Sequence, residues 1–354
     1  MTAALPPAVF HDIVVMPGGA IRRDGHRSID AGPLWPDFDQ QTWVRQCYAG
    51  RPVDQAPAPP DGPVAVLDRP AVWGAPLRPH FGHLVSELLT RLPWSLQGRP
   101  DDAYLFATAP GQRPGPAFQT LAAWFGLASS QILHVTRPVR VATLRVWPQA
   151  EQLDHGAPEP AYLDLLDTIA ARNGLVPAKA PLLYVTRDGL LARGKGGHAG
   201  EHHLVACLSR LGVPVLDPAT APLPDQLAHY AGAGRIVFAE GSALHGRQLL
   251  GWRAQQIVVL NRRRGARTAA AALQARCRSL TYVETARDVI LAPPHAGRQR
   301  PECALSHYDL AALFAAFAAL GVDLAPVWDM AAHDAAVAAD MAAWSTATAR
   351  AEVA

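Results

Sequence analysis

The chain is poor in cysteine and carries almost no excess charge. Its 354 residues include four cysteines, which lie far apart and share none of the spacings typical of metal ligands. We therefore expect buried free thiols in a reducing compartment, and neither a disulfide scaffold nor a metal site. The formal net charge is only +2, and no stretch interleaves clustered cations with aromatic residues, so nothing indicates a nucleic-acid partner.

Long apolar runs and the common nucleotide signatures are missing as well. No apolar run approaches the roughly 20 residues that a membrane-spanning helix needs. The first residues lack the basic segment, apolar core and cleavage site of a signal peptide, so we expect a cytoplasmic protein. Neither a P-loop nor a G-x-G-x-x-G motif after a predicted strand is present, which disfavours an ATPase and a nicotinamide dehydrogenase.

What is present predicts an α/β protein with two domains. Residues 1–65 are irregular, and 52–63 form a proline-rich loop. From residue 182 onward, short apolar strands alternate with helices of about ten residues, which predicts a parallel, doubly wound sheet. Residues 177–181 read as the link between the halves. We predict domains at 1–176 and 177–300 and a helical extension at 301–354.

The predicted elements follow from apolar periodicity. In the N-terminal half we expect strands at 10–16, 64–67, 71–73, 103–107, 131–134 and 141–146, and helices at 80–94, 118–125 and 159–173. In the C-terminal half we expect strands at 182–186, 213–216, 235–239, 256–260 and 280–283, and helices at 201–211, 225–233, 243–250, 269–278, 308–320 and 334–350.

A polar row accompanies the apolar face of the first predicted helix, which Pro93 should close. His83, Glu87 and Arg91 recur at four-residue steps, so His83 and Glu87 are close enough to hydrogen-bond. An imidazole held in this way can act as a general base. Two alternatives stay open: a helix surface with a Glu–Arg ion pair, and a weak metal site that adds His80.

A glycine-rich loop with clustered cations follows the strand at 182–186. It contains Arg187, Arg193 and Lys195 among four glycines. Arginine binds phosphate oxygens in pairs, so this loop suits a phosphate-bearing ligand. The alternative is a solvated surface loop.

A third candidate is the turn between the strand at 235–239 and the next helix. Gly241 and Ser242 allow a tight turn, Ala243 begins the helix, and His245 lies in its first turn. The N–H groups at such a helix start, with a donor from His245, can bind a phosphate. The alternative is an ordinary β–α turn.

These three segments, in this order, resemble the family 61 glycosyltransferases, specifically the bacterial branch found with capsular-polysaccharide biosynthesis genes. The resemblance covers roughly residues 75–262. It rests on an aromatic/Gly–His motif before a leucine-rich helix, a Ser/Thr–Arg pair after a strand, a helix opening with Glu, and a small-residue turn. The matching residues are Phe81, Gly82, His83, Glu87, Arg91, Leu92, Thr186, Arg187, Glu201 and those at 240–245.

The resemblance implies the GT-B architecture, with two Rossmann-like domains facing across a cleft and C-terminal helices that cross back. Domain 1–176 would then lie on the acceptor side, and domain 177–300 would bind the nucleotide sugar. It implies transfer from a nucleotide-diphosphate sugar to a hydroxyl of a surface or capsular glycan, free or lipid-linked. Peripheral contact with the inner face of the membrane stays open.

For the site, we expect a metal-independent reaction without a cofactor, and inversion at the transferred sugar. Arg187, with Arg193 or Lys195, the turn at 241–243 and His245 would stabilise the leaving diphosphate. His83 would deprotonate the acceptor, with Glu87 orienting it, or the two roles are exchanged. Two other functions stay open: a nucleotide-sugar epimerase of the same architecture, and a non-catalytic nucleotide- or glycan-binding assembly protein.

Overall fold

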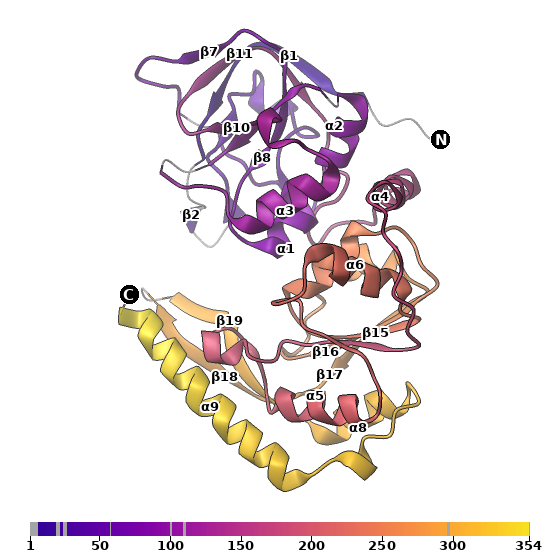
Figure 1. Cartoon of the computed structure of the whole chain (residues 1–354). Coiled ribbons are helices and arrows are strands. Elements are labelled where there is room, and N and C mark those ends of the chain that lie inside the picture. The colour runs from indigo at the N-terminus through magenta and orange to yellow at the C-terminus, as the bar shows by residue number, and fades with distance from the viewer. Residues whose placement is uncertain are drawn as a thin grey trace. The chain divides into compact units, whose positions relative to one another are not determined.

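The computed structural model describes residues 6–18, 22–23, 27–56, 58–99, 101–108, 111–295 and 298–353. The chain divides into two compact units. Unit 1 comprises Met1–Gly174, Gln248–Trp252 and Ala271–Arg276; unit 2 comprises Leu175–Arg247, Arg253–Ala270 and Cys277–Ala354. Both units combine helices with sheets, so the predicted mixed α/β fold is confirmed (Figure 1). The predicted domain limits and the cleft between domains stay predictions.

Unit 1 is built on a seven-stranded mixed sheet with the order β10-β9-β8-β11-β1-β4, in which β7 also pairs with β11. Strands β8 (Ala71–Pro76) and β9 (Ala103–Ala107) are buried along their whole length and pair in parallel. Such continuous apolar runs are typical of strands covered on both faces. The other strands are β1 (Ala8–Met16), β4 (Gly32–Pro33), β7 (Ala65–Leu67), β10 (Ile132–Val135) and β11 (Val139–Val146).

The prediction of one continuous helix at 80–94 is wrong. The segment forms α1 (Phe81–His83), the π-helical turn η2 (Leu84–Leu88) and α2 (Leu92–Gly98). Pro93 does not close the segment but lies in the first turn of α2, where its missing N–H has no helical partner to lose. Two regular helices, α3 (Pro116–Phe125) and α4 (Pro160–Arg172), match the predicted ones and also begin at proline.

Unit 2 contains a five-stranded parallel sheet with the order β14-β12-β15-β16-β17. Its strands are β12 (Leu183–Val185), β14 (Val215–Leu216), β15 (Arg235–Ala239), β16 (Gln256–Asn261) and β17 (Ser279–Glu284). Helix α6 (Leu223–Gly232) lies on one face, and α5 (Glu201–Arg210) and α8 (Leu310–Ala318) lie on the other (Figure 1). The predicted parallel, doubly wound sheet is confirmed.

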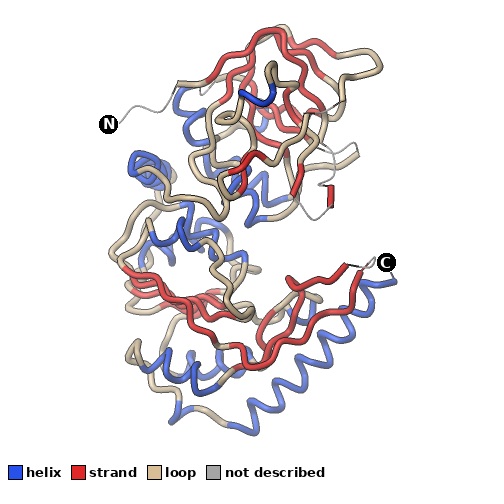
Figure 2. Tube along the Cα trace, turned by 180° about the vertical axis from the view of Figure 1, so that it is seen from behind, coloured by secondary structure: helices blue, strands red, loops and turns tan. Residues whose placement is uncertain are grey.

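The sequence did not predict a second sheet in unit 2. Strands β18 (Ala286–His295) and β19 (Arg298–Tyr308) pair antiparallel, and β13 (Gly197–Ala199) joins β19 in parallel. The start of the predicted helical extension at 301–308 is therefore strand. Helix α9 (Met330–Val353) lies along this sheet (Figure 2). Its Trp344 Nε1 donates to the carbonyl of Cys303 at 2.8 Å. That C-terminal helices cross back to the first domain stays a prediction.

Two further helices differ from the prediction. The expected α-helix at 243–250 is a 3-10 helix, η5 (Ser242–Leu249), and the one at 269–278 shortens to α7 (Ala270–Gln274). The remaining short elements are β2 (Arg22–Arg23), β3 (Arg27–Ser28), β5 (Cys47–Tyr48), β6 (Arg51–Pro52), η1 (Phe38–Gln40), η3 (Ser129–Gln131), η4 (Leu191–Arg193) and η6 (Ala325–Val327).

Two expectations about composition can be compared with the structure. All four cysteines are buried free thiols, as predicted. Among the helices of the described residues, none is long and apolar enough to span a bilayer.

Candidate functional site

The strand order of unit 2 marks one place in its sheet for a ligand. From β12 the chain moves outward to the edge strand β14, then returns past β12 to form β15, β16 and β17. In sheets of this order, ligands bind outside the carboxyl ends of the two strands where the winding reverses, here β12 and β15. Arg187 follows β12, and Gly241 follows β15. The two most prominent residues of the predicted donor site therefore lie at the switch point.

A buried carboxylate holds the turn that carries Arg187. One oxygen of Glu201, at the start of α5, accepts hydrogen bonds from Tyr184 Oη at 2.8 Å, Thr186 Oγ1 at 2.7 Å and the Arg187 N–H at 2.8 Å. Burial raises the pKa of Glu201, and these donors oppose the rise. Glu201 thus fixes the backbone from which Arg187 projects.

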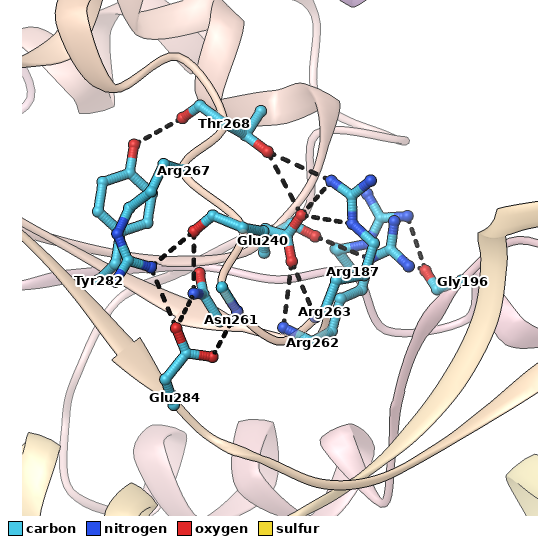
Figure 3. A network of polar contacts seen from close by, with 12 residues as sticks. Arg187, Gly196, Glu240, Asn261, Arg262, Arg263, Arg267, Thr268, Tyr282 and Glu284 are labelled. Atoms are coloured by element: carbon cyan, nitrogen blue, oxygen red, sulfur yellow. Dashed lines mark hydrogen bonds and ion pairs between the residues drawn. The ribbon is translucent and has the colours of Figure 1, made fainter. Parts of the chain in front are cut away.

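The guanidinium of Arg187 lies against Gly241, in the turn that follows β15. Its Nε and Nη2 donate to the carbonyl of Gly196 at 3.1 and 2.7 Å (Figure 3). A Cβ atom on Gly241 would overlap Nη1 of Arg187. Only glycine lets the guanidinium approach the backbone this closely. Burial lowers the pKa of Arg187, and the carboxylates of Glu201 and Glu240 oppose that effect.

A second buried carboxylate, that of Glu240, binds two arginines of the loop after β16. Its side chain is fully buried and forms an ion pair with Arg263, whose Nε is 2.8 Å from Oε1 (Figure 3). The backbone N–H groups of Arg262 and Arg263 donate to its other oxygen at 3.2 and 3.1 Å. The Nε of Arg262 donates to the Glu240 carbonyl at 3.2 Å.

Arg262 has a buried nitrogen with no partner among the described residues. The residue is only 4% exposed, and its Nη1 makes no hydrogen bond. Burial lowers the pKa of Arg262 to about 10, and the nearby charge of Arg187 adds to this effect. Leaving a buried donor unpaired costs about 1–3 kcal/mol, more for a charged group. An acceptor oxygen of a bound ligand would remove this cost.

The charges around this position favour an anion. The guanidinium groups of Arg187, Arg262 and Arg263 face two carboxylates, Glu201 and Glu240. Gly196 brings the loop backbone next to Arg262, because a Cβ on Gly196 would overlap Arg262 Nη1. We call Arg187, Arg262 and Arg263 the arginine cluster.

The loop after β16, which carries Arg262 and Arg263, is also held by contacts with β17. Glu284, at the end of β17, accepts hydrogen bonds from Asn261 Nδ2 at 2.8 Å, Arg267 Nη1 at 3.0 Å and the Gly265 N–H at 3.2 Å (Figure 3). The Tyr282 hydroxyl donates to the carbonyl of Thr268 at 2.6 Å. The loop is therefore held in place before any ligand binds.

The sequence reasoning overlooked Arg262 and Arg263, although a signal was present. Three consecutive arginines follow the predicted strand at 256–260, and the carboxyl ends of parallel strands share one edge of a sheet. Arg193 and Lys195 were selected instead. Both are exposed, and the hydrogen bonds and ion pairs of the described residues do not include their side chains.

The other residues of the predicted donor site lie along η5. Ser242 and Ala243 are half-buried at its start, and His245 is buried within it. Their roles toward a phosphate stay predictions.

Unit 1 holds the second candidate site, the pair His83–Glu87. The imidazole Nδ1 lies 2.5 Å from Glu87 Oε1, and the two side chains are 16% and 6% exposed. The side-chain amides of Gln46 and Gln149 donate to the Glu87 carbonyl at 3.1 and 2.7 Å. A proton on Nδ1, donated to the carboxylate, leaves Nε2 as the nitrogen that can take a proton from a substrate.

A π-helical turn interrupts the regular helix between His83 and Arg91, the third member of the predicted polar row. Leu89 N–H donates to the carbonyl of Leu84, five residues back, at 2.9 Å. Such π turns are frequent at functional sites. Arg91 points into the interior, where it donates to the carbonyls of Val44 and Arg45 at 3.1 and 3.4 Å, and burial lowers its pKa to about 10. Arg91 is thus buried among backbone carbonyls, and the ion pairs found in the described part of the chain do not include it.

The metal alternative can be compared with the described part of the chain. There, no group of three or more His, Cys, Asp or Glu side chains is arranged to hold a metal ion. The ring of His80 does lie near that of His83, with centroids 4.8 Å apart.

Part of the chain matches a known protein family. Residues 81–247 match the family model described as Glycosyltransferase 61, and no curated protein matches the chain. The matched segment begins at the first residue of α1 and ends within η5. It includes the His83–Glu87 pair and the Arg187–Gly241 contact but neither Arg262 nor Arg263.

Proposed function

Because residues 81–247 match glycosyltransferase family 61, which supports a sugar transferase, we propose that the protein transfers a sugar from a nucleotide-diphosphate donor to a glycan hydroxyl. The observation that carries the proposal is the arginine cluster at the sheet's switch point, with the unpartnered Nη1 of Arg262. A diphosphate supplies the anionic oxygens that this nitrogen lacks.

The cluster would act on the leaving group. As the bond between the anomeric carbon and the diphosphate oxygen breaks, negative charge builds up on that oxygen. Fixed donors from Arg187 and Arg262, together with the N–H groups of the turn at 241–243, stabilise this charge without having to reorganise. Arg193, Lys195 and His245 are proposed to add contacts to the donor. Because guanidinium groups can neutralise a diphosphate, we propose that the reaction needs neither a metal nor a cofactor.

The His83–Glu87 pair would act on the acceptor. Nε2 of His83 takes the proton of the acceptor hydroxyl as its oxygen attacks the anomeric carbon, and Glu87 orients the ring and stabilises the imidazolium. A single displacement of this kind inverts the anomeric configuration. The proposal requires the two units to act on one donor–acceptor pair in the GT-B arrangement.

The setting of the reaction is part of the proposal. The matched family supports a sugar donor and a glycan acceptor in general. We propose a surface or capsular glycan, free or lipid-linked, with the enzyme in the cytoplasm or at the inner face of the membrane.

Thermal-shift measurements with UDP, GDP, CMP and their sugars, with and without Mg²⁺, test the donor site. A ligand at 100 times its dissociation constant stabilises the protein by about 2.7 kcal/mol. We expect a selective shift that needs no Mg²⁺ and is lost in Arg187→Ala and Arg262→Met. The control is Arg278→Ala, because Arg278 is exposed and directly precedes β17, at the amino ends of the strands of the same sheet. No shift with any nucleotide, or an equal shift in all variants, would contradict the proposal.

A further inference from the structure

A pocket in unit 2 adjoins the arginine cluster. It has a volume of about 460 Å³ and lies between the loop after β16 and the β18–β19 hairpin. Arg263, a member of the cluster, both lines the pocket and pairs with Glu240. The described lining residues are Arg263, Arg264, Arg287, Asp288, Val289, Leu291, Pro301 and Ala304. The pocket and the arginine cluster therefore share Arg263.

The lining of the pocket combines apolar and charged residues. Val289, Leu291, Pro301 and Ala304 are the apolar ones. Val289 and Leu291 are 37% and 49% exposed, so each offers apolar surface that a ligand in the pocket can cover.

The other lining residues are charged, and most of that charge is already compensated. Arg263 pairs with Glu240, and Arg287 Nε lies 2.9 Å from Asp288 Oδ2. Arg264 donates through Nη2 to the carbonyl of Arg287 at 2.5 Å, a bond that ties the loop to the hairpin. The pocket therefore does not present a second arginine cluster for a second highly charged group. It suits a flat, mostly uncharged group with some hydrogen-bonding atoms.

From this chemistry we propose that the pocket binds the nucleoside of the donor, so that the β18–β19 hairpin determines which nucleotide the enzyme accepts. The inference rests on the proposed function for the position of the diphosphate. A base packs against Val289 and Leu291, the guanidinium plane of Arg264 is available for stacking on it, and Asp288 can accept from ribose hydroxyls. The hairpin lies outside the matched segment 81–247.

Titration calorimetry on the full-length protein tests this proposal with two kinds of probe. The first is a panel of nucleoside diphosphates (UDP, GDP, CDP and ADP), and the second is inorganic pyrophosphate, which has no base. The test variant is Val289→Gln/Leu291→Gln. The matched control is Ile290→Gln, because Ile290 lies between these residues and is also 37% exposed, but does not line the pocket.

We expect wild-type protein to prefer one nucleoside diphosphate over the others and over pyrophosphate. In the double variant, loss of the apolar side chains should weaken that nucleotide by about tenfold and leave pyrophosphate unchanged. Pyrophosphate binding also shows that the variant is folded. Ile290→Gln should bind both probes like wild type.

Two results would overturn the inference. One is unchanged nucleotide affinity in the double variant; the other is equal affinity of wild type for pyrophosphate and every nucleotide. Failure of the proposed function has a different signature: selective nucleotide binding that depends on Val289 and Leu291, without any sugar transfer. In that case the pocket assignment holds and the transferase does not.

Discussion

Arg262 and Gly241 show how single residues shape the proposed donor site. The buried Nη1 of Arg262 has no hydrogen-bond partner among the described residues, and an anion bound there would supply one. Gly241 contributes space, because it has no side chain that would overlap the guanidinium of Arg187. The guanidinium of Arg187 and the glycine that leaves room for it therefore follow different strands of one sheet.

Replacing Gly241 by alanine should displace Arg187. The added methyl would overlap the guanidinium, so we expect nucleoside diphosphate affinity to fall about tenfold or more through loss of a charge-assisted contact. Gly62→Ala is the control, since nothing lies within 4 Å of a Cβ there. Titration calorimetry of both variants decides; unchanged affinity in Gly241→Ala would show that Arg187 does not contact the ligand.

Substitution of His83 should slow the reaction without weakening donor binding. His83→Ala is expected to lower kcat by about a hundredfold or more, the usual contribution of a general base, with donor affinity unchanged. Glu87→Gln should cost less, because an amide can still accept from Nδ1. Steady-state kinetics with a direct binding assay check both values. A larger loss in Glu87→Gln would make Glu87 the base and His83 the positioning residue.

At the scale of elements, strands were more predictable than helix type. Apart from β4 (Gly32–Pro33), which was not predicted, the strands of both large sheets contain short apolar runs that the sequence pattern indicates. The break of the segment 80–94 at the π turn, and the 3-10 form of η5, depend on packing that periodicity does not encode. The β18–β19 hairpin was not predicted, because β18 contains Pro293 and Pro294, which are uncommon within strands, and much of it is exposed.

The candidate site was predictable to a similar degree. The His83–Glu87 hydrogen bond follows from the four-residue spacing and is present despite the π turn. Arg187 and Gly241 were found because each follows a recognisable strand. Their direct contact required the strand order, which sequence alone leaves open. Arg262 was missed although it follows a predicted strand.

The first turn of α5 should make stability sensitive to pH. His202 Nδ1 lies 2.8 Å from Asp188 Oδ2, and this bond, aided by the charges of Asp188 and Asp340, raises the pKa of His202 above its ordinary 6.5. The added stability is fully present below pH 6.5 and is lost as pH rises through the raised pKa.

The effect should be small, because the imidazole is largely exposed. We expect His202→Gln to be less stable than wild type by about 0.2–1 kcal/mol at pH 6 and equal to it at pH 9. Urea unfolding at both pH values measures the difference. A constant difference at the two values would rule out a charged His202 as its source.

At the scale of the whole molecule, each of the two units is built from separate segments of the chain. Unit 1 includes Gln248–Trp252 and Ala271–Arg276, which come from the C-terminal half. Within unit 1, Arg276 forms a buried ion pair with Glu151, with Nη1 2.5 Å from Oε1. Burial raises the pKa of Glu151, and the charge of Arg276 opposes the rise. Unit 1 therefore depends on a residue far along the chain.

Breaking this pair should destabilise the protein strongly. Arg276→Met leaves Glu151 buried without its partner, and we expect a loss of about 3–5 kcal/mol. The double variant Glu151→Met/Arg276→Met removes both charges and should recover most of it. Chemical denaturation of the three proteins measures these values; equal stability of the single and double variants would show that the charge of Glu151 is not the cause.

The central claim is transfer of a sugar from a nucleotide donor, and product analysis tests it most directly. The protein is incubated with the nucleotide sugar that gives the largest thermal shift and with a mixture of mono- and oligosaccharide acceptors, and nucleotide products are identified by mass spectrometry. We predict release of the free nucleoside diphosphate, with a glycosylated acceptor, and loss of both in His83→Ala. Donor returned with an altered sugar would indicate an epimerase, and donor that binds but is never consumed would indicate a binding protein; either result would contradict the account.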